Sequence, residues 1–221
     1  MIKLDADLLL RAYAAGVFPM AESADSRDIF WVDPEERGIL PLEAFHLSRR
    51  LRRTLRADPF EIRIDRDFRA VMGGCAMPTL MRPKTWINDE LVHLYCDLYR
   101  RERAHSVGAW QDGELVGGLY GVTLGAVFFG ESMFSRATDS SKVALAHLVA
   151  RLKRGGFKLL DIQFVTPHLS QFGAIAVPRA RYRRILAAGL ARPARWSVEP
   201  ISGADVIALL SGPCAEVTAT A

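Results

Sequence analysis

Cysteine is scarce in this sequence and is not clustered. The three cysteines, Cys75, Cys96 and Cys214, lie far apart, with no CxxC pair and no group of cysteine and histidine. Structural zinc sites and disulfide frameworks both need such groupings. We therefore expect no disulfide framework and no bound metal.

Long apolar runs are missing as well. No stretch approaches the length of a membrane-spanning helix. The first residues, MIKLDADLLLRAYAAG, carry two Asp within their apolar stretch, which a secretory signal would not. Half of the residues are hydrophobic and 24% are charged, which suits a packed core rather than disorder. We expect a cytoplasmic protein with no membrane partner.

Acidic residues are absent from one arginine-rich stretch. Residues 48–56, SRRLRRTLR, hold five Arg and no Asp or Glu, in a chain of net charge +4. On a helix, Arg49, Arg53 and Arg56 recur at spacings of three and four residues and share one face. Such a face can bind RNA phosphates without reading sequence, and it can also be a solvated charged surface. The lack of any acid favours the phosphate interpretation.

Hydrophobic periodicity predicts a mixture of helices and strands. Helices are expected over residues 5–16, 44–58, 66–76, 87–103, 140–156 and 178–189, and strands over 29–32, 37–42 and 60–65, with a turn at 17–23. A hairpin is expected over 105–124, and further strands at 126–131 and 158–164. The last two strands should be parallel, because a helix connects them. The fold class expected is α+β, a mixed sheet flanked by helices, in an order that resembles the core of the GNAT acyltransferase superfamily.

Polar side chains stand where these last two strands end. Glu131 follows the third strand, and Asp161 and Gln163 close the fourth, two residues apart and so on one face. Ligands of open α/β sheets bind beyond such strand ends. We expect one polar crevice, floored by Met133, Phe134 and Phe164. The alternative is structural: Glu131 caps a neighbouring amide and Asp161 pairs with an Arg.

The expected crevice offers no obvious nucleophile, because none of the five His sits in a recognisable Ser or Cys motif. A carboxylate beside an amide is suited to holding an amine and accepting its proton. An α-amine with a pKa near ~8 is mostly protonated at neutral pH. An activated ester would need little more than a deprotonated and well-placed amine.

Six segments together resemble the leucyl/phenylalanyl-tRNA–protein transferase family. They are AYAAGVFPM (12–20), TWIN (85–88), AHSVGAW (104–110), LVGGLYGV (115–122), GESMFSR (130–136) and LLDIQF (159–164), the last followed by SQFGA and PRARY. The resemblance runs from Leu10 to Arg184. It implies transfer of Leu, Phe or Met from aminoacyl-tRNA to proteins with N-terminal Arg or Lys, marking them for N-end rule degradation. It also implies a small N-terminal α/β domain, here residues 1–58, on a GNAT-like catalytic domain, residues 59–221, with no cofactor.

The resemblance also implies roles for single residues. Asp161 and Gln163 match the proposed catalytic pair, which orients and polarises the attacking amine, and Glu131 matches the acidic residue at the substrate amino group. Trp86 matches an aromatic residue near the terminal adenosine. Further matches are Met133 and Phe134 at the Leu/Phe side-chain pocket and Arg49, Arg53 and Arg56 at the tRNA.

Two positions depart from the family pattern. Met20 replaces a frequent aromatic residue at the substrate site, so one stacking partner is weaker. Gly108 replaces a usual Glu, which removes an acidic group near the hairpin. Either departure could alter substrate choice.

Three other functions stay open. The first is the same chemistry with a different acceptor preference. The second is a GNAT N-acetyltransferase, although residues 135–142, SRATDSSK, lack the Gly-rich turn that would bind a pyrophosphate. The third is a basic RNA-binding module without chemistry, for which Glu131, Asp161 and Gln163 would be dispensable.

Overall fold

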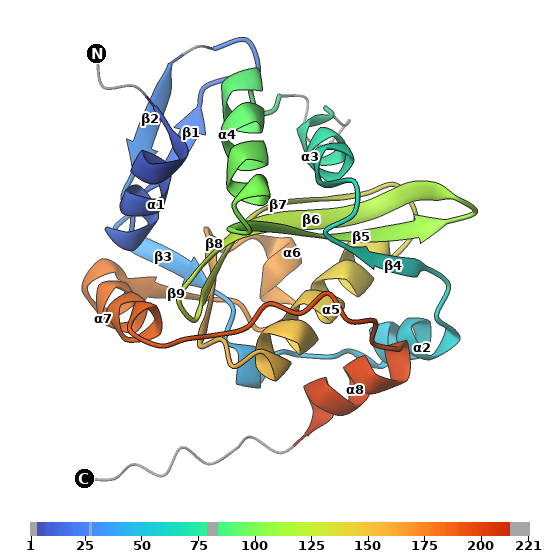
Figure 1. Ribbon diagram of the computed structural model, residues 1–221. Helices are drawn as coiled ribbons and strands as arrows, with labels where there is room; N and C mark the ends of the chain where they lie inside the picture. The colour runs from blue at the N-terminus through green and yellow to red at the C-terminus, as the bar shows by residue number, and fades with distance from the viewer. Residues whose placement is uncertain (1–3, 27, 79–83, 213–221) are drawn as a thin grey trace, which may run out of the picture.

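A computed structural model describes residues 4–26, 28–78 and 84–212 (Figure 1). Cys214 lies outside the described residues. In chain order the elements are α1 (Ala6–Ala14), β1 (Phe18–Ala21), β2 (Ile29–Val32), β3 (Glu36–Ile39), the short 3-10 helix η1 (Leu42–Ala44), α2 (Arg49–Ala57), β4 (Glu61–Ile64), α3 (Phe68–Ala76), α4 (Asp89–Arg100), β5 (Ala104–Gln111), β6 (Glu114–Leu124), β7 (Val127–Ser135), α5 (Ser140–Arg154), β8 (Leu159–Gln163), α6 (Pro167–Ser170), β9 (Ile175–Pro178), α7 (Arg179–Leu190) and α8 (Gly203–Ser211).

A seven-stranded mixed sheet forms the centre of the molecule. Its strand order is β4-β5-β6-β7-β8-β3-β9, and β1 and β2 form a separate two-stranded ribbon. Helices α3 and α4 cover one face of the sheet, and α2, α5 and α8 lie on the other (Figure 1). Each face buries its own apolar cluster. The expected α+β class, with a mixed sheet flanked by helices, is confirmed.

The expected hairpin of β5 and β6 has a turn that its sequence favours. Asp112 and Gly113 both have positive φ, 52° and 82°. A two-residue turn of this kind matches the right-handed twist of the flanking strands, and Asp-Gly is a preferred pair for it. The long β6 that follows pairs with β5 on one side and β7 on the other. It is therefore the strand against which β7 is positioned.

The prediction that the third strand ends at Glu131 is wrong, because β7 continues to Ser135. Across the ladder, Gly121 lies opposite Gly130 and Tyr120 lies opposite Ser132. Glu131 is thus one extra residue on β7, a β-bulge, which re-aims a side chain without ending the strand. The strand continues because β6 supplies partners beyond the bulge.

The sheet opens next to this bulge. Strands β7 and β8 are parallel, as predicted, with Val127, Phe128 and Phe129 opposite Leu159, Leu160 and Asp161. No pair follows Phe129 and Asp161 in the ladder. The two strands therefore separate at the level of Glu131 and Gln163, which leaves room for a ligand between them.

The large sheet crosses the division expected at residue 58. Strand β3 comes from the N-terminal segment, yet it lies between β8 and β9 and pairs antiparallel with both. Whether residues 1–58 form a unit of their own stays a prediction. The turn expected at residues 17–23 is wrong, because β1 begins at Phe18 and pairs with β2. The sequence pattern indicated neither β9 nor the helices α6 and α8.

Candidate active site

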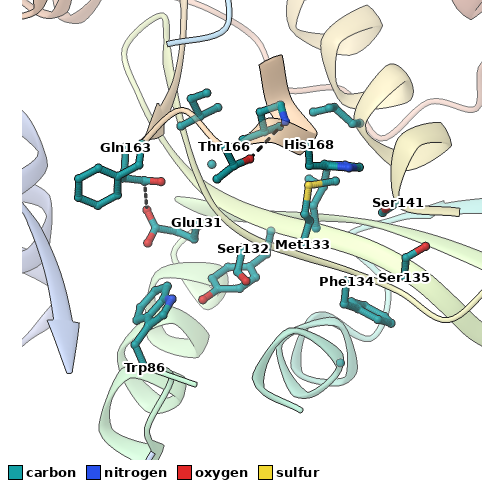
Figure 2. Close-up of a pocket in the computed structure, with 18 of the residues that line it drawn as sticks. Trp86, Glu131, Ser132, Met133, Phe134, Ser135, Ser141, Gln163, Thr166 and His168 are labelled. Atoms are coloured by element: carbon teal, nitrogen blue, oxygen red, sulfur yellow. Dashed lines mark hydrogen bonds between the residues drawn. The ribbon is translucent and has the colours of Figure 1, made fainter. Parts of the chain in front are cut away.

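A cavity of about 1160 Å³ occupies the opening between β7 and β8 (Figure 2). Residues of the β1–β2 ribbon, β6, β7, β8 and α5 contribute to its walls. Seven of the residues predicted at the site line it: Met20, Trp86, Glu131, Met133, Phe134, Gln163 and Phe164. Asp161 does not, although both of its chain neighbours do. The structure thus brings most of the predicted set together around one space.

Glu131 projects from the bulge and is held on both carboxylate oxygens. The Tyr95 hydroxyl donates to its Oε2 at 2.7 Å, and the Gln163 amide donates from Nε2 to its Oε1 at 3.1 Å. Figure 2 shows the Glu131–Gln163 bond at the cavity wall, with Trp86 facing the same space. The Tyr95 hydroxyl in turn lies 2.6 Å from that of Tyr13. Helices α1 and α4 therefore fix the orientation of a carboxylate on β7.

Burial raises the pKa of Glu131 to about 7, because the charged form loses its hydration. The hydroxyls of Tyr95 and Tyr13 and the charge of Arg37 act in the opposite direction, and the negative Asp161 adds to the rise. The carboxyl group consequently changes charge near neutral pH. That property is common in acid–base groups of active sites and also occurs in structural networks.

Asp161 is placed differently from the expectation. Its side chain is 0% exposed and forms an ion pair with Arg37, whose Nε and Nη2 donate to the carboxylate at 2.9 and 2.7 Å. The Tyr182 hydroxyl donates at 2.6 Å, and the backbone N–H of Gln163 donates at 2.9 Å. The expected crevice shared by Asp161 and Gln163 is therefore wrong. Asp161 lies beneath the cavity floor and holds the backbone of Gln163.

The backbone at Gln163 explains the difference. Its φ is +56°, in the left-handed region, so the two-residue alternation of the strand does not extend to this position. Gln163 consequently turns toward Glu131 while Asp161 turns toward Arg37. A left-handed non-glycine residue carries a conformational cost that the surrounding contacts must offset.

Four residues of this network were missed by sequence reasoning: Arg37, Tyr95, Tyr13 and Tyr182. Arg37 is 1% exposed, and its guanidinium lies over the rings of Phe18 and Tyr182, at 4.3 and 4.8 Å from their centroids. The available signal was an Arg at the first position of the predicted strand 37–42, which favours a charged partner if the strand is buried. No local signal identified the three tyrosines.

Met133 and Phe134, expected in one pocket, lie on opposite sides of β7. Phe134 belongs to the apolar cluster beneath α3 and α4, and its ring packs against Gly74. Met133 packs against the cluster beneath α5. On the Met133 side the cavity wall is mostly apolar, with the leucines Leu145, Leu148, Leu160 and Leu169. The cavity therefore has an apolar arm beside Met133.

Comparison with known proteins identifies the family. A family model for leucyl/phenylalanyl-tRNA protein transferase matches residues 39–187, and a model for the N-terminal domain of that family matches residues 3–35. The chain belongs to this family. Leucyl/phenylalanyl-tRNA–protein transferase from Paramagnetospirillum magneticum is 63% identical over 194 residues, which cover 88% of this chain and 93% of that protein. The protein of the same name from Rhodopseudomonas palustris strain TIE-1 is 54% identical over 209 residues, with 93% of each chain covered.

The two family models meet between residues 35 and 39, at the start of β3, rather than at residue 58. Among solved structures, L-PGS from Bacillus licheniformis matches 74% of this chain and 55% of its own, with a TM-score of 0.39 and 14% identity. That likeness is too weak to identify the fold.

The structure places both departures from the family pattern. Met20 lines the cavity and lies directly across the ribbon from Phe30, which is exposed. Gly108 lies in β5 opposite Gly118 and does not line the cavity. A Cβ atom at this position would meet the side chains of Trp110 and Leu115.

The basic face of α2 is exposed, as the spacing predicted. Arg49, Arg53 and Arg56 are all exposed, and none of them has an ion pair with a residue that the structure describes. None lines the cavity. The start of α2 is tied to the start of α5 by the ion pair of Arg50 and Asp139 at 3.2 Å. Because Ser141 of α5 lines the cavity, the start of α5 connects the cavity to this basic helix.

The described residues contain neither a metal site nor a membrane-spanning helix. In residues 4–26, 28–78 and 84–212, no group of three or more His, Cys, Asp or Glu could hold a metal ion. Of the helices in the described part of the chain, none has the length and apolarity needed to cross a membrane.

Proposed function

We propose that this chain transfers Leu or Phe from aminoacyl-tRNA to the N-terminal Arg or Lys of acceptor proteins, and thereby marks them for N-end rule degradation. The transferase activity follows from family membership, while the particular amino acids and acceptor residues are part of the proposal. The observation that carries it is the Glu131–Gln163 pair at the wall of the cavity. A cytoplasmic location is proposed with it, because charged tRNA is a substrate.

Direct attack by the acceptor amine on the ester is the chemistry that this cavity supports. Hydroxyls of Ser132, Ser135, Ser141 and Thr166 line it. None of the hydrogen bonds between described residues joins these hydroxyls to a histidine, so an activated serine or threonine nucleophile has no support. An aminoacyl ester is already activated, and positioning of the two substrates supplies much of the remaining rate.

Each predicted residue then has a task. The apolar arm beside Met133 accepts the Leu or Phe side chain, and Trp86 and Met20 contact the terminal adenosine. Gln163 orients the amine, and Asp161 acts through Gln163 by holding its backbone N–H. Phe134 closes the opposite wall of the cavity.

The acceptor stem of the tRNA extends from the cavity over the start of α5 to the basic face of α2. Arg49, Arg53 and Arg56 meet its phosphates there, which would position the tRNA without reading its sequence. The large sheet is proposed to be GNAT-like, because its one parallel pair, β7 and β8, separates beside the site. The weaker alternative, a GNAT N-acetyltransferase, would bind acetyl-CoA at the start of α5.

The test is a transfer assay with purified protein, charged Leu-tRNA or Phe-tRNA, and peptides that begin with Arg, Lys, Asp or Ala. We expect mass spectrometry to show one added Leu or Phe on the Arg and Lys peptides. Added product on the Asp or Ala peptides alone would support the alternative acceptor preference. No product on any peptide, beside an active reference transferase, would refute the proposal, and acetylation with acetyl-CoA would favour the rival.

A further inference from the structure

Of the two carboxylates next to Gln163, only one can meet a substrate. Asp161 is 0% exposed and its two oxygens accept four donor groups in all, from Arg37, Tyr182 and the Gln163 backbone. Glu131 lines the cavity and accepts from Tyr95 and Gln163, with the Tyr13 hydroxyl as a third neighbouring donor. A carboxylate has about four lone-pair sites, so Glu131 keeps room for an incoming N–H.

We propose that Glu131 is the catalytic base of the transfer, which takes the proton from the α-amine of the acceptor, and that Tyr95 positions it. This proposal rests on the proposed function and assigns the proton transfer within it. Asp161 and Gln163 then orient the amine but do not take its proton. An amide such as that of Gln163 is in any case a very weak base, and its amide nitrogen already donates to Glu131.

The other titratable groups of the cavity do not compete for this role. His168 lines the cavity, but Figure 2 shows it beside the Met133 arm and separated from Glu131. Its pKa is lowered by burial and by the charge of Lys142. Arg136 is permanently charged and cannot accept a proton.

The proposed step balances without a further reactant. The step starts from the neutral form of the acceptor amine, which has already lost one proton to the solvent. Its nitrogen bonds to the ester carbonyl carbon, and one of its two remaining protons passes to a Glu131 oxygen. The bond from that carbon to the terminal ribose oxygen then breaks, and the ribose oxygen takes the proton from Glu131. The carboxylate is regenerated, a peptide bond has formed and the tRNA leaves with its hydroxyl restored.

The surroundings of Glu131 set the pH at which it can act. Tyr95 of α4 and Tyr13 of α1 stabilise its charged form, as does Arg37 of β3, whereas burial and Asp161 of β8 disfavour it. Tyr120 of β6 lies near the two tyrosines and lines the cavity. A base whose pKa lies near the working pH is largely in its ionised, proton-accepting form there and still binds a proton well. Because the ionised form is the base, the rate should rise as the pH rises through about 7.

The test separates this ionisation from that of the acceptor amine. A peptide whose N-terminal amine is replaced by an aminooxy group stays neutral from mildly acidic pH upward, because an aminooxy group is a much weaker base than an α-amine. With this acceptor the wild-type rate should rise through one ionisation near pH 7 and then level off. In Glu131→Gln the rate should be lower by ~10²–10⁴-fold at the plateau and should lack this ionisation. The α-amine of the aminoacyl ester is the same for both proteins, so its own titration cancels in the ratio of the wild-type rate to the variant rate. The same ionisation in Glu131→Gln as in wild type would overturn the proposal.

A second variant keeps the proposal testable if Glu131→Gln does not fold. Tyr95→Phe removes a donor to the ionised carboxylate, so the midpoint of the pH profile should move up by about one unit. Tyr99→Phe is the matched control on the same helix, because its hydroxyl donates to the backbone oxygen of Asp65 instead. The control should leave the midpoint unchanged. An unmoved midpoint in Tyr95→Phe would refute the positioning role.

These outcomes differ from a failure of the proposed function. Were wild-type protein to yield no product with either the amine or the aminooxy acceptor, the function itself would be wrong. Product in wild type with an unchanged profile in both Glu131→Gln and Tyr95→Phe would leave the function standing and remove Glu131 as the base.

Discussion

The buried pair of Asp161 and Arg37 makes a sharp prediction at the scale of single residues. In Asp161→Asn the Arg37 guanidinium keeps its charge but loses its counter-charge inside the core, 1% exposed. Breaking one side of a buried ion pair typically costs about 3–5 kcal/mol. We expect the free energy of unfolding, measured in urea, to fall by that amount.

A surface ion pair provides the matched control. Asp33 accepts from Arg183 at 2.7 Å and lies near Arg179, and all three side chains are partly exposed. Asp33→Asn should therefore cost less than about 1 kcal/mol. If Asp161→Asn were as stable as Asp33→Asn and yet inactive, Asp161 would act in the chemistry itself, as the sequence pattern suggested.

The candidate site was predictable to the extent that it depends on neighbours along the chain. The nearness of Glu131 and Gln163 follows from the apolar stretches that precede them in two neighbouring parallel strands, although β7 itself continues to Ser135. The burial of Asp161 does not follow from the local sequence, because its partner Arg37 is 124 residues away. The bulge at Glu131 and the positive φ of Gln163 are also invisible to a two-residue alternation.

Helix α2 has one face buried in the core and one basic face exposed to solvent. Leu51 and Leu55 are buried, while Arg49, Arg53 and Arg56 are exposed. Reversing these three Arg to Glu should raise the KM for aminoacyl-tRNA and make it less dependent on salt. Losing three phosphate contacts should reduce the slope of log K against log salt by about two to three units. The measurement is KM over a salt series.

An aminoacyl-adenosine substrate serves as the control for folding, since it has no acceptor stem. It should be used almost as well by the α2 variant as by wild type. A second control reverses Arg181 and Arg184 of α7, which are also exposed. Equal losses for tRNA and for the short substrate would show that α2 matters for stability rather than for phosphate binding.

Element prediction succeeded where the pattern is long and regular. Helices α4 and α5 and the β5–β6 hairpin carry their own periodicity and turn residues. Strand β9 has four residues, of which only Val177 is buried, and α6 has four. Such short pieces are positioned by tertiary contacts, here the pairing of β9 with β3, and sequence windows cannot detect them.

At the scale of the whole molecule, β3 connects the N-terminal segment to the catalytic sheet. It fills the place between β8 and β9, and Arg37, on β3, reaches the backbone oxygen of Gly16 at 3.1 Å as well as Asp161. The N-terminal segment therefore supplies a central strand and the charge that neutralises Asp161. A division at residue 58 would remove both from the sheet.

The last prediction follows from this arrangement. A chain that starts at residue 59 should fail to unfold cooperatively, because β8 and β9 lose the strand between them and Asp161 is left as an unpaired buried charge. Calorimetry and circular dichroism on heating would measure this. The comparison is a chain that starts at residue 36, which keeps β3 and Arg37 but lacks Tyr13 and Phe18 of the core. That chain should retain a cooperative transition at a lower temperature than the full chain. A sharp transition for residues 59–221 alone would instead establish the division at residue 58, and it would mean that Arg37 is not needed to hold Asp161.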